Sequence, residues 1–456
     1  NNLQIIFHTN LRIGDCKVKK IIIDKKCLLV LFLKIYFLNR KVMSCKNCKS
    51  TKLIKRVEIG NQPLSGFFYK KIHKKLPKYS LDLFQCKVCG LVQIKNKFNV
   101  KKMYGQHYGY ETSKSKLMVS HLKEKVSRFK KKGYLKIGNS VVDIGSNDAT
   151  FLNLIGDKNI RYGVDPSGKK FADNYHKINL INNFFSRKKI KPKNTQFDLI
   201  TSFAIFYDVE DPNQFCLDIK NILKPNGIWV CEISYLPLML KNLTFDQICH
   251  EHVTYYSLNV FEKIINKNGL KLLDVKLNEI NGGSIEIICS HKSSRRSINK
   301  KFIEILKRDE LKINKKSFLN FSNRIKKVKK DLNSFLVNKK NILGYGASTK
   351  GNVVLNFCKI TSKKLKLICD ANEKKIGSFT PGSNIPIISK EKMRKIFPKY
   401  LLVLIWSFRK EVIKQETNYI KSGGNLVFHL PKFHIINKKN YKSYLNKDFK
   451  DMSYRY

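Results

Sequence analysis

Short apolar runs separated by amphipathic stretches fill most of the chain from residue 140 onward. VVDIG (141–145), YGVD (162–165) and FDLITSF (197–203) have the length and apolar character of buried strands, and helical stretches lie between them. This alternation predicts a parallel α/β sheet covered by helices. A second series of the same kind begins at NILGYGAS (341–348). The pattern therefore predicts an α/β protein with two nucleotide-binding-type sheets.

A charged stretch with helical periodicity joins the two series. Between residues 297 and 338 apolar positions such as Ile303, Leu306, Ile325 and Leu332 recur at helical spacing, which predicts connecting helices. The segment before the first series contains paired cysteines, short β-type runs and turn residues, which indicates a small separate module. The expected domains are a module over 43–100, a central α/β domain over 101–295 and a C-terminal α/β domain over 296–456.

The first 42 residues do not fit this organisation. The chain opens without Met, and Met43 stands directly before the first motif, so we expect residues 1–42 to be an extension outside the functional protein. CLLVLFLKIYFL (27–38) is the membrane candidate, but it includes Lys34 and is shorter than the roughly 18 to 20 apolar residues of a membrane span. A short anchor or a buried helix is the competing interpretation.

Lysine dominates the composition. The chain of 456 residues has 90 Lys and Arg against 34 Asp and Glu, a formal net charge of +56. Such a charge can indicate nucleic acid or an anionic membrane as a partner. The lysines are scattered, however, and neither an aromatic-studded basic groove nor clustered arginines accompany them. We therefore expect neither partner, whereas a small phosphate-bearing substrate would suit a basic surface.

The cysteines divide into two groups. Cys45 and Cys48 form one CxxC pair and Cys86 and Cys89 form another, the ligand spacing of a tetrahedral Zn²⁺ site. The stretch between the pairs is longer than in a compact finger, so a small domain must fold there. Four ligands leave no open coordination position, so the zinc should hold the fold rather than do chemistry. The other cysteines are isolated in apolar or mixed runs, and a reducing cytoplasm is the expected location.

VVDIGSNDATFL (141–152) predicts a strand, a glycine-containing turn and a helix start, and it resembles the first motif of class I S-adenosylmethionine methyltransferases. Glycine lets the backbone approach a ligand, and a helix N-terminus can receive an anionic group such as the methionine carboxylate. An acid that ends the next strand can accept hydrogen bonds from ribose hydroxyls. A dinucleotide-binding turn is the rival interpretation. The candidate cofactor residues are Asp143, Gly145, Asn147, Asp148 and Asp165.

DQICHEHVTYYS (246–257) gathers several proton-handling groups just after the fifth predicted strand of the central domain. His250 and His252 flank Glu251; on a strand both histidines would share one face, and in a loop all three could converge. The spacing differs from the i, i+4 pair of a helical zinc site. Histidine titrates near neutrality, which suits a general base that removes a proton next to a carbonyl. A hydrogen-bonded structural cluster is the alternative.

GYGASTKG (344–351) is a third candidate site. It follows a predicted strand and opens a helix, so its backbone N–H groups could hold a pyrophosphate with Lys350 nearby. Asp370 ends the following strand and could contact a ribose. An NAD site or a plain turn would give the same local pattern.

Taken together, these motifs resemble the sugar C-methyltransferases, which act on nucleotide-linked deoxy-keto-sugars. The resemblance extends from Met43 to about residue 435. It implies a zinc-binding N-terminal domain, a class I methyltransferase domain and a C-terminal Rossmann-like domain that helps to hold the nucleotide-sugar. The segments that carry it are CKVCGLVQ (86–93), VVDIGSND (141–148), FDQICHEHVTYYSL (245–258), NGGS (281–284), GYGASTKGNVVLNF (344–357) and IGSFTPGSNIPIIS (376–389).

The resemblance also implies residue roles. It makes His252 the first candidate for the catalytic base with Glu251 as its partner, adds His250, and brings Tyr110 to the active site. The substrate-binding candidates are Gly282, Gly283, Gly346, Lys350 and Asp370. The sequence departs from the family pattern at several positions, where a different residue is usual: Ala149, Tyr207, Cys249, Glu111 and Glu286.

The function expected from these features is transfer of a methyl group from S-adenosylmethionine to a carbon of a nucleotide-linked keto-sugar, after proton removal beside the ketone. The expected cofactors are S-adenosylmethionine and a structural Zn²⁺. The alternatives are a zinc-ribbon RNA methyltransferase, an O- or N-methyltransferase of a small molecule on the same fold, and a non-catalytic nucleotide-binding scaffold.

Overall fold

The computed structural model describes residues 5–7, 11–13, 16–18, 21–23, 43–73, 75–95, 98–99, 103–104, 109–192 and 194–454. The chain divides into two compact units, Asn1–Ser44 and Cys45–Tyr456. In the first unit β1 (Ile5–Phe7) pairs with β4 (Ile21–Ile23), and β2 (Leu11–Ile13) with β3 (Cys16–Val18), both antiparallel. The apolar run 27–38 lies outside the described residues. Among the residues that are described, no helix has the length and apolar character to cross a membrane.

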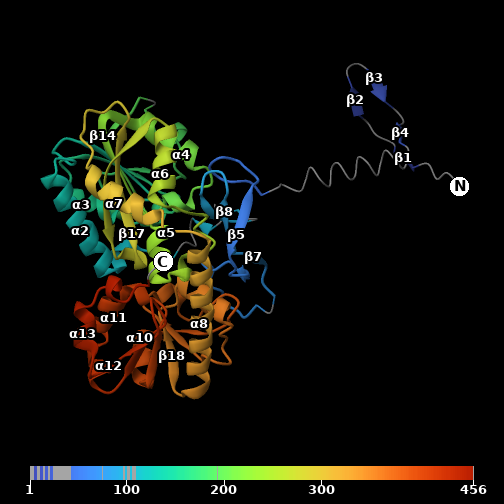
Figure 1. The fold of residues 1–456 in the computed structure, drawn as a ribbon, viewed down its shortest axis with the longest axis vertical. Helices are drawn as coiled ribbons and strands as arrows, with labels where there is room; N and C mark the ends of the chain where they lie inside the picture. The colour runs from blue at the N-terminus through green and yellow to red at the C-terminus, as the bar shows by residue number, and fades with distance from the viewer. Residues whose placement is uncertain are drawn as a thin grey trace. The chain divides into compact units, whose positions relative to one another are not determined.

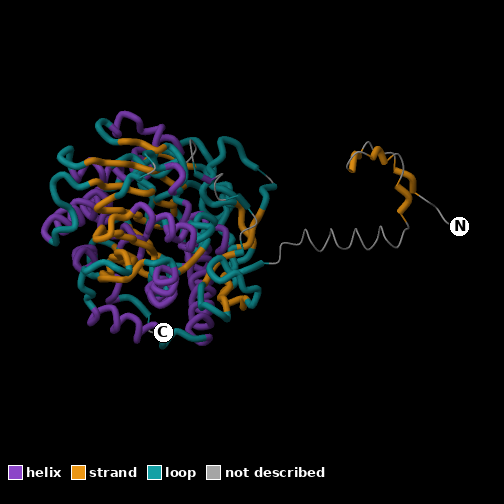
Figure 2. The backbone as a smooth tube through the Cα atoms, turned by 90° about the horizontal axis from the view of Figure 1, so that it is seen from above, coloured by secondary structure: helices purple, strands orange, loops and turns teal. Residues whose placement is uncertain are grey.

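In its described residues the second unit holds sheets of seven, six, four and two strands, and helices surround the two largest (Figure 2). Its first part is a small module that contains β5 (Leu53–Val57), β8 (Leu83–Cys86) and β9 (Val92–Ile94), together with a hairpin of β6 (Asn61–Pro63) and β7 (Lys78–Ser80). The module's sheet has the order β15-β9-β8-β5. Its last strand, β15 (Thr254–Tyr255), comes from far along the chain and pairs antiparallel with β9.

The central sheet has seven strands in the order β12-β11-β10-β13-β14-β17-β16. The strands from β12 to β14 pair in parallel, whereas β17 is antiparallel to both of its neighbours. This strand order, with β17 as its reversed strand, is that of the class I methyltransferase fold, which the sequence predicts. The strands are β10 (Ser140–Ile144), β11 (Ile160–Val164), β12 (Asn179–Ile181), β13 (Phe197–Phe203), β14 (Leu223–Ser234), β16 (Leu270–Asn278) and β17 (Ser284–His291).

Helices cover both faces of the central sheet (Figure 1). On β10, Val141 packs in one buried cluster with α2 (Lys116–Lys131) and α3 (Thr150–Ile155), whereas the next residue, Val142, packs in another with α4 (Pro212–Ile222) and α6 (Leu258–Lys267). Successive side chains of a strand point to opposite faces. A strand buried on both faces therefore has a continuous apolar run, which is why VVDIG identifies it.

Two helices connect the central sheet to the C-terminal sheet, as the helical spacing predicts. They are α7 (Lys300–Glu310) and α8 (Lys315–Asn338). The side chain of Asn314 caps α8 by accepting hydrogen bonds from the backbone N–H groups of Lys316 and Ser317. Apolar side chains of α8, such as Phe321, Ile325 and Leu332, are buried on one face, and its lysines lie on the other.

The C-terminal sheet has the order β20-β19-β18-β21-β22-β23, parallel except for β23. The chain order reverses between β18 and β21, the point where open α/β sheets bind ligands outside their carboxyl ends. The strands are β18 (Ile342–Tyr345), β19 (Ile368–Asp370), β20 (Ile387–Ser389), β21 (Tyr400–Val403), β22 (Asn425–Phe428) and β23 (His434–Ile436). The helices are α9 (Thr349–Cys358), α10 (Lys390–Ile396), α11 (Arg409–Gln415), α12 (Thr417–Lys421) and α13 (Tyr441–Asn446).

Candidate functional site

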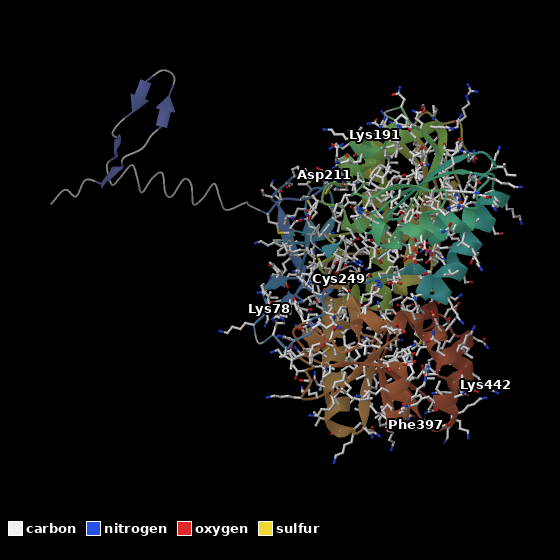
Figure 3. All side chains as sticks on the ribbon, turned by 180° about the vertical axis from the view of Figure 1, so that it is seen from behind. Lys78, Lys191, Asp211, Cys249, Phe397 and Lys442 are labelled. Atoms are coloured by element: carbon white, nitrogen blue, oxygen red, sulfur yellow. The ribbon has the colours of Figure 1, made fainter. Side chains whose placement is uncertain are left out.

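A cavity of about 1190 Å³ lies where the module and the two larger sheets meet. Its lining comes from the module at Gly66, from the central sheet at Ile144 and Val164, and from the C-terminal domain at Lys350. Ile144 and Val164 are the last residues of their strands, so the cavity opens at the carboxyl ends of the parallel strands. Cys249, another lining residue, lies near the middle of the unit in Figure 3.

The turn after β10 forms one wall of the cavity. Gly145 has φ of +78°, and a Cβ at this position would lie 2.2 Å from Cδ1 of Ile205. Only glycine fits both the backbone angle and the contact, and this lets the chain turn tightly at the cavity wall. Ala149 adopts a left-handed conformation just before α3, so the departure from the glycine usual there leaves the turn intact.

Two acids line the same wall. The Asp165 carboxylate accepts hydrogen bonds from the backbone N–H groups of Asn147 at 2.9 Å and Ser167 at 2.7 Å, which fix its orientation. Asp143 accepts a hydrogen bond from the Thr201 hydroxyl at 2.6 Å, and burial raises its pKa to about 7. A glycine turn and an oriented acid at the end of the next strand fit the ribose and the amino-acid part of S-adenosylmethionine.

Asn147 lines the cavity, and the side chains of Asn147 and Asp148 both bind the segment that carries Tyr110. The Asn147 amide donates to the Tyr110 carbonyl at 3.0 Å and accepts from the Thr112 backbone at 3.0 Å. Asp148 accepts from the Ser113 backbone at 2.8 Å and is not among the residues that line the cavity. Both side chains therefore connect the segment that carries Tyr110 to the turn after β10. Tyr110 itself lines the cavity.

His252 lies on the cavity wall with a defined tautomer. Its Nδ1 is 2.9 Å from the Gln247 carbonyl oxygen, and a carbonyl only accepts, so Nδ1 carries the proton and Nε2 has the lone pair. Its ring centroid lies 4.1 Å from that of Tyr207. Burial, together with the positive charge of Lys350, lowers the pKa of His252 to about 3. The imidazole is therefore neutral at physiological pH.

Glu251 lines the cavity beside His252, but within the described residues no hydrogen bond joins the two side chains. The expected pairing is thus corrected, because the Gln247 carbonyl is the group that orients the imidazole. Burial raises the pKa of Glu251 to about 7. A Cβ on Gly66 would lie 2.6 Å from the Glu251 carboxylate, so glycine at this position makes room for the acid.

His250, expected as a catalytic candidate, is not among the lining residues. It is fully buried, with Nδ1 3.2 Å from the Ser65 hydroxyl and its ring centroid 5.2 Å from that of Phe98. Residues 249–251 form a bend, and residues 248–253 include no strand, so the two histidines do not share a strand face. Burial lowers the pKa of His250 to about 4. The structure therefore assigns His250 to packing against the module.

Backbone hydrogen bonds hold residues 246–257, the histidine segment, against the module. The Ile94 N–H donates to the Val253 carbonyl at 3.1 Å, and the Val253 N–H donates to the Tyr207 carbonyl at 2.9 Å. Thr254 then pairs with Gln93 across β15 and β9. β15, which follows His252, is thus the edge strand of the module's sheet. No local sequence signal indicated that this segment pairs with the module.

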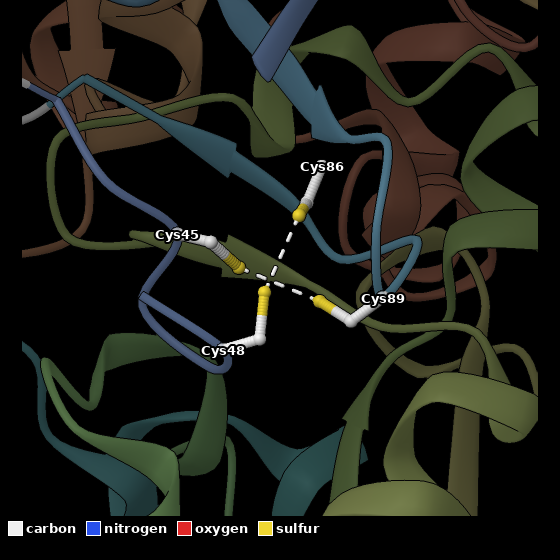
Figure 4. Close-up of side chains that lie close together, drawn as sticks. All are labelled: Cys45, Cys48, Cys86 and Cys89. Carbon is white, nitrogen blue, oxygen red and sulfur yellow. Dashed lines mark hydrogen bonds between the residues drawn. The ribbon is translucent and has the colours of Figure 1, made fainter. Parts of the chain in front are cut away.

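The four cysteines of the two CxxC pairs converge in the module (Figure 4). Their sulfur atoms all lie within 4.8 Å of one another, with Cys45 and Cys89 at 3.4 Å and Cys48 and Cys86 at 3.5 Å. Four thiols at this separation fit a tetrahedral Zn²⁺. Cys86 ends β8, and the turn with Cys89 leads into β9, so the metal site lies at the base of the strand that pairs with β15.

Of the expected substrate residues, Lys350 alone is among the residues that line the cavity. A Cβ on Gly282 would lie 2.6 Å from the Trp406 ring, and one on Gly346 would lie 2.7 Å from Ile405. Gly283 packs as closely, 2.8 Å from the Leu238 side chain. These glycines allow close packing rather than contact with the cavity. Asp370 lies outside the lining and accepts a hydrogen bond from the Asn372 backbone at 2.8 Å.

Sequence reasoning did not select four further acids that line the cavity: Asp208, Glu210, Glu232 and Asp246. Tyr104 donates to Asp208 at 2.7 Å, and the Trp406 indole donates to Asp246 at 2.8 Å. Burial raises the pKa of both aspartates. Asp246 stands inside the motif DQICHEHVTYYS, and Asp208 directly follows Tyr207. Residue type alone does not show which member of a motif faces a cavity.

Glu111 and Glu286, two of the departures from the family pattern, lie away from the cavity lining. Glu286 is fully buried and binds Arg128 through two hydrogen bonds of 2.6 and 2.7 Å. Glu111 forms an ion pair of 2.9 Å with Lys374. By contrast, Tyr207 and Cys249 both line the cavity, so these two departures alter its wall directly.

Three family models match the chain in succession. A zinc binding domain matches residues 45–104, a methyltransferase domain residues 116–275, and a C-methyltransferase C-terminal domain residues 279–431. The curated C-methyltransferase NovU of Streptomyces niveus is 26% identical over 415 residues, which cover 88% of this chain and 98% of that protein.

Solved methyltransferase structures match part of the chain. An S-adenosylmethionine-dependent methyltransferase from Clostridium acetobutylicum is 16% identical, with a TM-score of 0.30, over 38% of this chain and 91% of its own. Magnesium protoporphyrin IX methyltransferase from Synechocystis, solved with bound SAH, is 13% identical, with a TM-score of 0.31, over 43% of this chain and 90% of its own.

Proposed function

We propose that the chain is an S-adenosylmethionine-dependent C-methyltransferase with a zinc-binding domain, and that its substrate is a nucleotide-linked deoxy-keto-sugar. The three family models and the likeness to NovU support the proposal. One observation carries the mechanism: His252 presents an unprotonated Nε2 on the wall of a cavity that the donor turn and the C-terminal domain share. The proposed parts are a zinc module over 43–100, a methyltransferase domain over 101–295 and a substrate domain over 296–456.

The donor binds against the turn after β10 in this proposal. Gly145 allows the close approach, and Asp165, oriented by two backbone N–H groups, accepts hydrogen bonds from the ribose hydroxyls. Asp143 lies beneath the turn and is held by Thr201. Bound S-adenosylmethionine supplies an electrophilic methyl group on a sulfonium. The protein has to place a carbon nucleophile in line with that group and exclude water.

His252 generates the nucleophile. Nε2 takes a proton from the carbon next to the ketone, and the electron pair moves to the ketone oxygen as an enolate forms. Because burial keeps the imidazole neutral, its lone pair is available across the physiological pH range. The Gln247 carbonyl accepts from Nδ1–H and so steadies the imidazolium that forms. Glu251 lines the same cavity and favours that cation when it is ionised.

The nucleotide end of the substrate fits a group of lysines on the same cavity. These lysines come from the module, the central domain and the C-terminal domain, and they are Lys70, Lys170, Lys374 and Lys375. Four cations around one opening suit a diphosphate. We also place the reaction in the cytoplasm, since four of the thiols form a metal-ligand set, which requires reduced cysteine.

Mass spectrometry of products tests the substrate class. Purified protein is incubated with methyl-labelled S-adenosylmethionine and thymidine, guanosine and cytidine diphosphate 4-keto-6-deoxysugars. We expect the label on a ring carbon of at least one sugar, and exchange of the adjacent hydrogen in deuterium oxide. A label on oxygen or nitrogen, or exclusively on RNA, would contradict the proposal.

The His252→Ala variant tests the base. We expect it to abolish methyl transfer and hydrogen exchange, while calorimetry shows unchanged affinity for S-adenosylmethionine, since Nε2 serves proton removal and not donor binding. His250→Ala is the matched control, because His250 lies off the cavity and its loss should lower stability but not turnover per folded molecule. Full activity in His252→Ala would overturn the assignment.

A further inference from the structure

The side chain of Lys350 lines the cavity, and within the described residues its ammonium group has hydrogen-bond donors without a protein acceptor. It lies in the first turn of α9 and lines the cavity. Its ammonium group has three N–H donors, and within the described residues one of them is used, in a 2.8 Å hydrogen bond to the side-chain oxygen of Asn281. None of the described carboxylates forms an ion pair with it. A largely desolvated ammonium with free donors needs an anionic partner from the ligand.

The ammonium group of Lys350 interacts electrostatically with titratable groups of the histidine segment. Burial and then the positive charge of Lys350 lower the pKa of His252. Burial also lowers the pKa of Lys350, whereas the carboxylates of Asp246 and Glu251 act to raise it. All of them line the same cavity. A Cβ on Gly66 would lie 2.6 Å from the Glu251 carboxylate and 3.7 Å from the hydroxyl of Thr349, the residue before Lys350. Lys350 therefore lies at the end of the cavity where the proposed function has proton removal.

The other lysines on the C-terminal side of the cavity differ from Lys350. The Lys374 side chain is 63% exposed and pairs with Glu111 at 2.9 Å. Lys375 donates to the Ala347 carbonyl at 2.8 Å and lies 3.7 Å from Asp370. These lysines have protein partners away from His252. They suit the part of the substrate that remains outside the reacting centre.

The helix that carries Lys350 begins at the cavity, where Ser348 and Thr349 are lining residues, and its next turn packs against the module. The Ser348 hydroxyl already accepts from the Gly351 backbone N–H at 3.0 Å. Asn352, one residue further, is fully buried and donates to the Ser65 carbonyl of the module at 2.8 Å. Residues 65 and 66 in turn contact His250 and Glu251.

We propose that Lys350 is a catalytic residue whose ammonium group binds the ketone oxygen of the substrate and stabilises the enolate, with Asn281 as its positioning residue. The inference rests on the proposed function. When Nε2 of His252 takes the proton, the C–H electron pair forms the carbon–carbon double bond and the ketone π electrons move to oxygen. Lys350 donates hydrogen bonds to that oxygen as its negative charge develops. On methyl transfer the ketone re-forms, and the proton stays on His252.

Hydrogen exchange without methyl transfer tests this role directly. The reactive 4-keto-6-deoxysugar diphosphate from the product screen is incubated in deuterium oxide with S-adenosylhomocysteine, and loss of the proton beside the ketone is followed by NMR. We expect Lys350→Met, which keeps the apolar stem, to lower both the exchange rate and kcat by about 100-fold or more, the usual effect of removing an oxyanion donor. The KM for the sugar should change far less.

Lys375→Met is the matched control, since Lys375 belongs to the same domain and lines the same cavity. We expect it to raise KM with kcat nearly unchanged, the result that a phosphate ligand gives. A Lys350→Met variant that exchanges hydrogen at the wild-type rate, or that raises KM alone, would overturn the inference. Calorimetry with S-adenosylmethionine and zinc content verify that each variant is folded.

A second variant guards against indirect effects. Lys350→Ala leaves space for a small amine, so added methylamine should restore part of the exchange rate if the missing group is an electrophile. No rescue at any concentration, together with normal donor binding, would count against the catalytic role. Failure of the proposed function looks different: the wild type itself would then show no exchange with any keto-sugar of the series.

Discussion

Two histidines that are two residues apart have unrelated environments. His252 presents its Nε2 lone pair to a cavity, because the Gln247 carbonyl fixes the proton on Nδ1, whereas His250 is packed between Ser65 and the Phe98 ring. Glu251, between them, remains a candidate partner in catalysis but not through a hydrogen bond to His252. Residue type identified the group of three, and only the direction of each side chain separates their roles.

The ionisation of Glu251 predicts a pH-dependent effect on stability. Burial raises its pKa to about 7, whereas an unfolded glutamate titrates near about 4.3. Between these values the folded protein binds more protons than the unfolded chain, so the contribution of Glu251 to the free energy of unfolding falls as the pH rises through this window. Glu251→Gln, which stays neutral, should raise Tm at pH 8 and change it little at pH 4.5.

Thermal unfolding at the two pH values measures this difference. The exposed Glu58 of the module provides the control, as Glu58→Gln removes a carboxylate that does not have to be desolvated. An increase in Tm that is equal at both pH values, or one that Glu58→Gln reproduces, would show that burial of the charge is not the cause.

At the scale of elements, one strand pair links the metal site to the histidine segment. β9 follows the second cysteine pair and pairs with β15, directly after His252. Without zinc, the four thiols no longer hold the start of β9, and the hydrogen bond from Ile94 to Val253 loses its support. We therefore expect the loss of a structural zinc to change the position of His252, the proposed base.

Removal of zinc should therefore abolish methyl transfer before it unfolds the central sheet. Cys89→Ser, or a strong chelator, should reduce turnover about in proportion to the zinc lost, since a structural site contributes its binding energy to local folding. The affinity for S-adenosylmethionine should change much less, because the donor turn belongs to another sheet. Cys369→Ser is the control, since Cys369 is buried in β19 outside the ligand set. Retained turnover in zinc-free protein would contradict this link.

At the scale of the whole molecule, one hydrophobic core is shared by parts that are far apart in sequence. Leu83 of the module, Phe245 of the histidine segment, Phe318 of α8 and Leu402 of the C-terminal sheet belong to one buried cluster. The central sheet has its own two clusters, one on each face. The module and the C-terminal domain therefore position the histidine segment, together with the central sheet that it follows.

Trp406 provides a test of this arrangement. Its indole N–H donates to Asp246 in the cavity wall at 2.8 Å, so Trp406→Phe leaves that buried carboxylate short of a partner. We expect a loss of about 1–3 kcal/mol in the free energy of unfolding and a fall in kcat. Trp229→Phe removes a similar bond, 2.9 Å to Ser202 inside the central sheet, and should cost stability without affecting kcat. Equal kinetic effects of the two variants would refute the assignment.

Local pattern was enough to predict a large part of this protein. The apolar runs gave both α/β series because strands buried on two faces are apolar throughout, and the CxxC spacing gave the ligand set because two residues between thiols suit a metal turn. The left-handed turn at Gly145 followed from residue type for the same local reason. Each of these signals lies within a few residues of its structural consequence.

Tertiary structure decided the rest. The pairing of β15 with β9, the packing of Gly282 against Trp406 and the place of Lys350 beside the histidine segment all join residues that are far apart in sequence. Which member of a polar group faces a cavity depends on such contacts, since they set the direction of each side chain. The sequence by itself determined the kinds of chemical group and the sheets that carry them, and folding determined which groups meet.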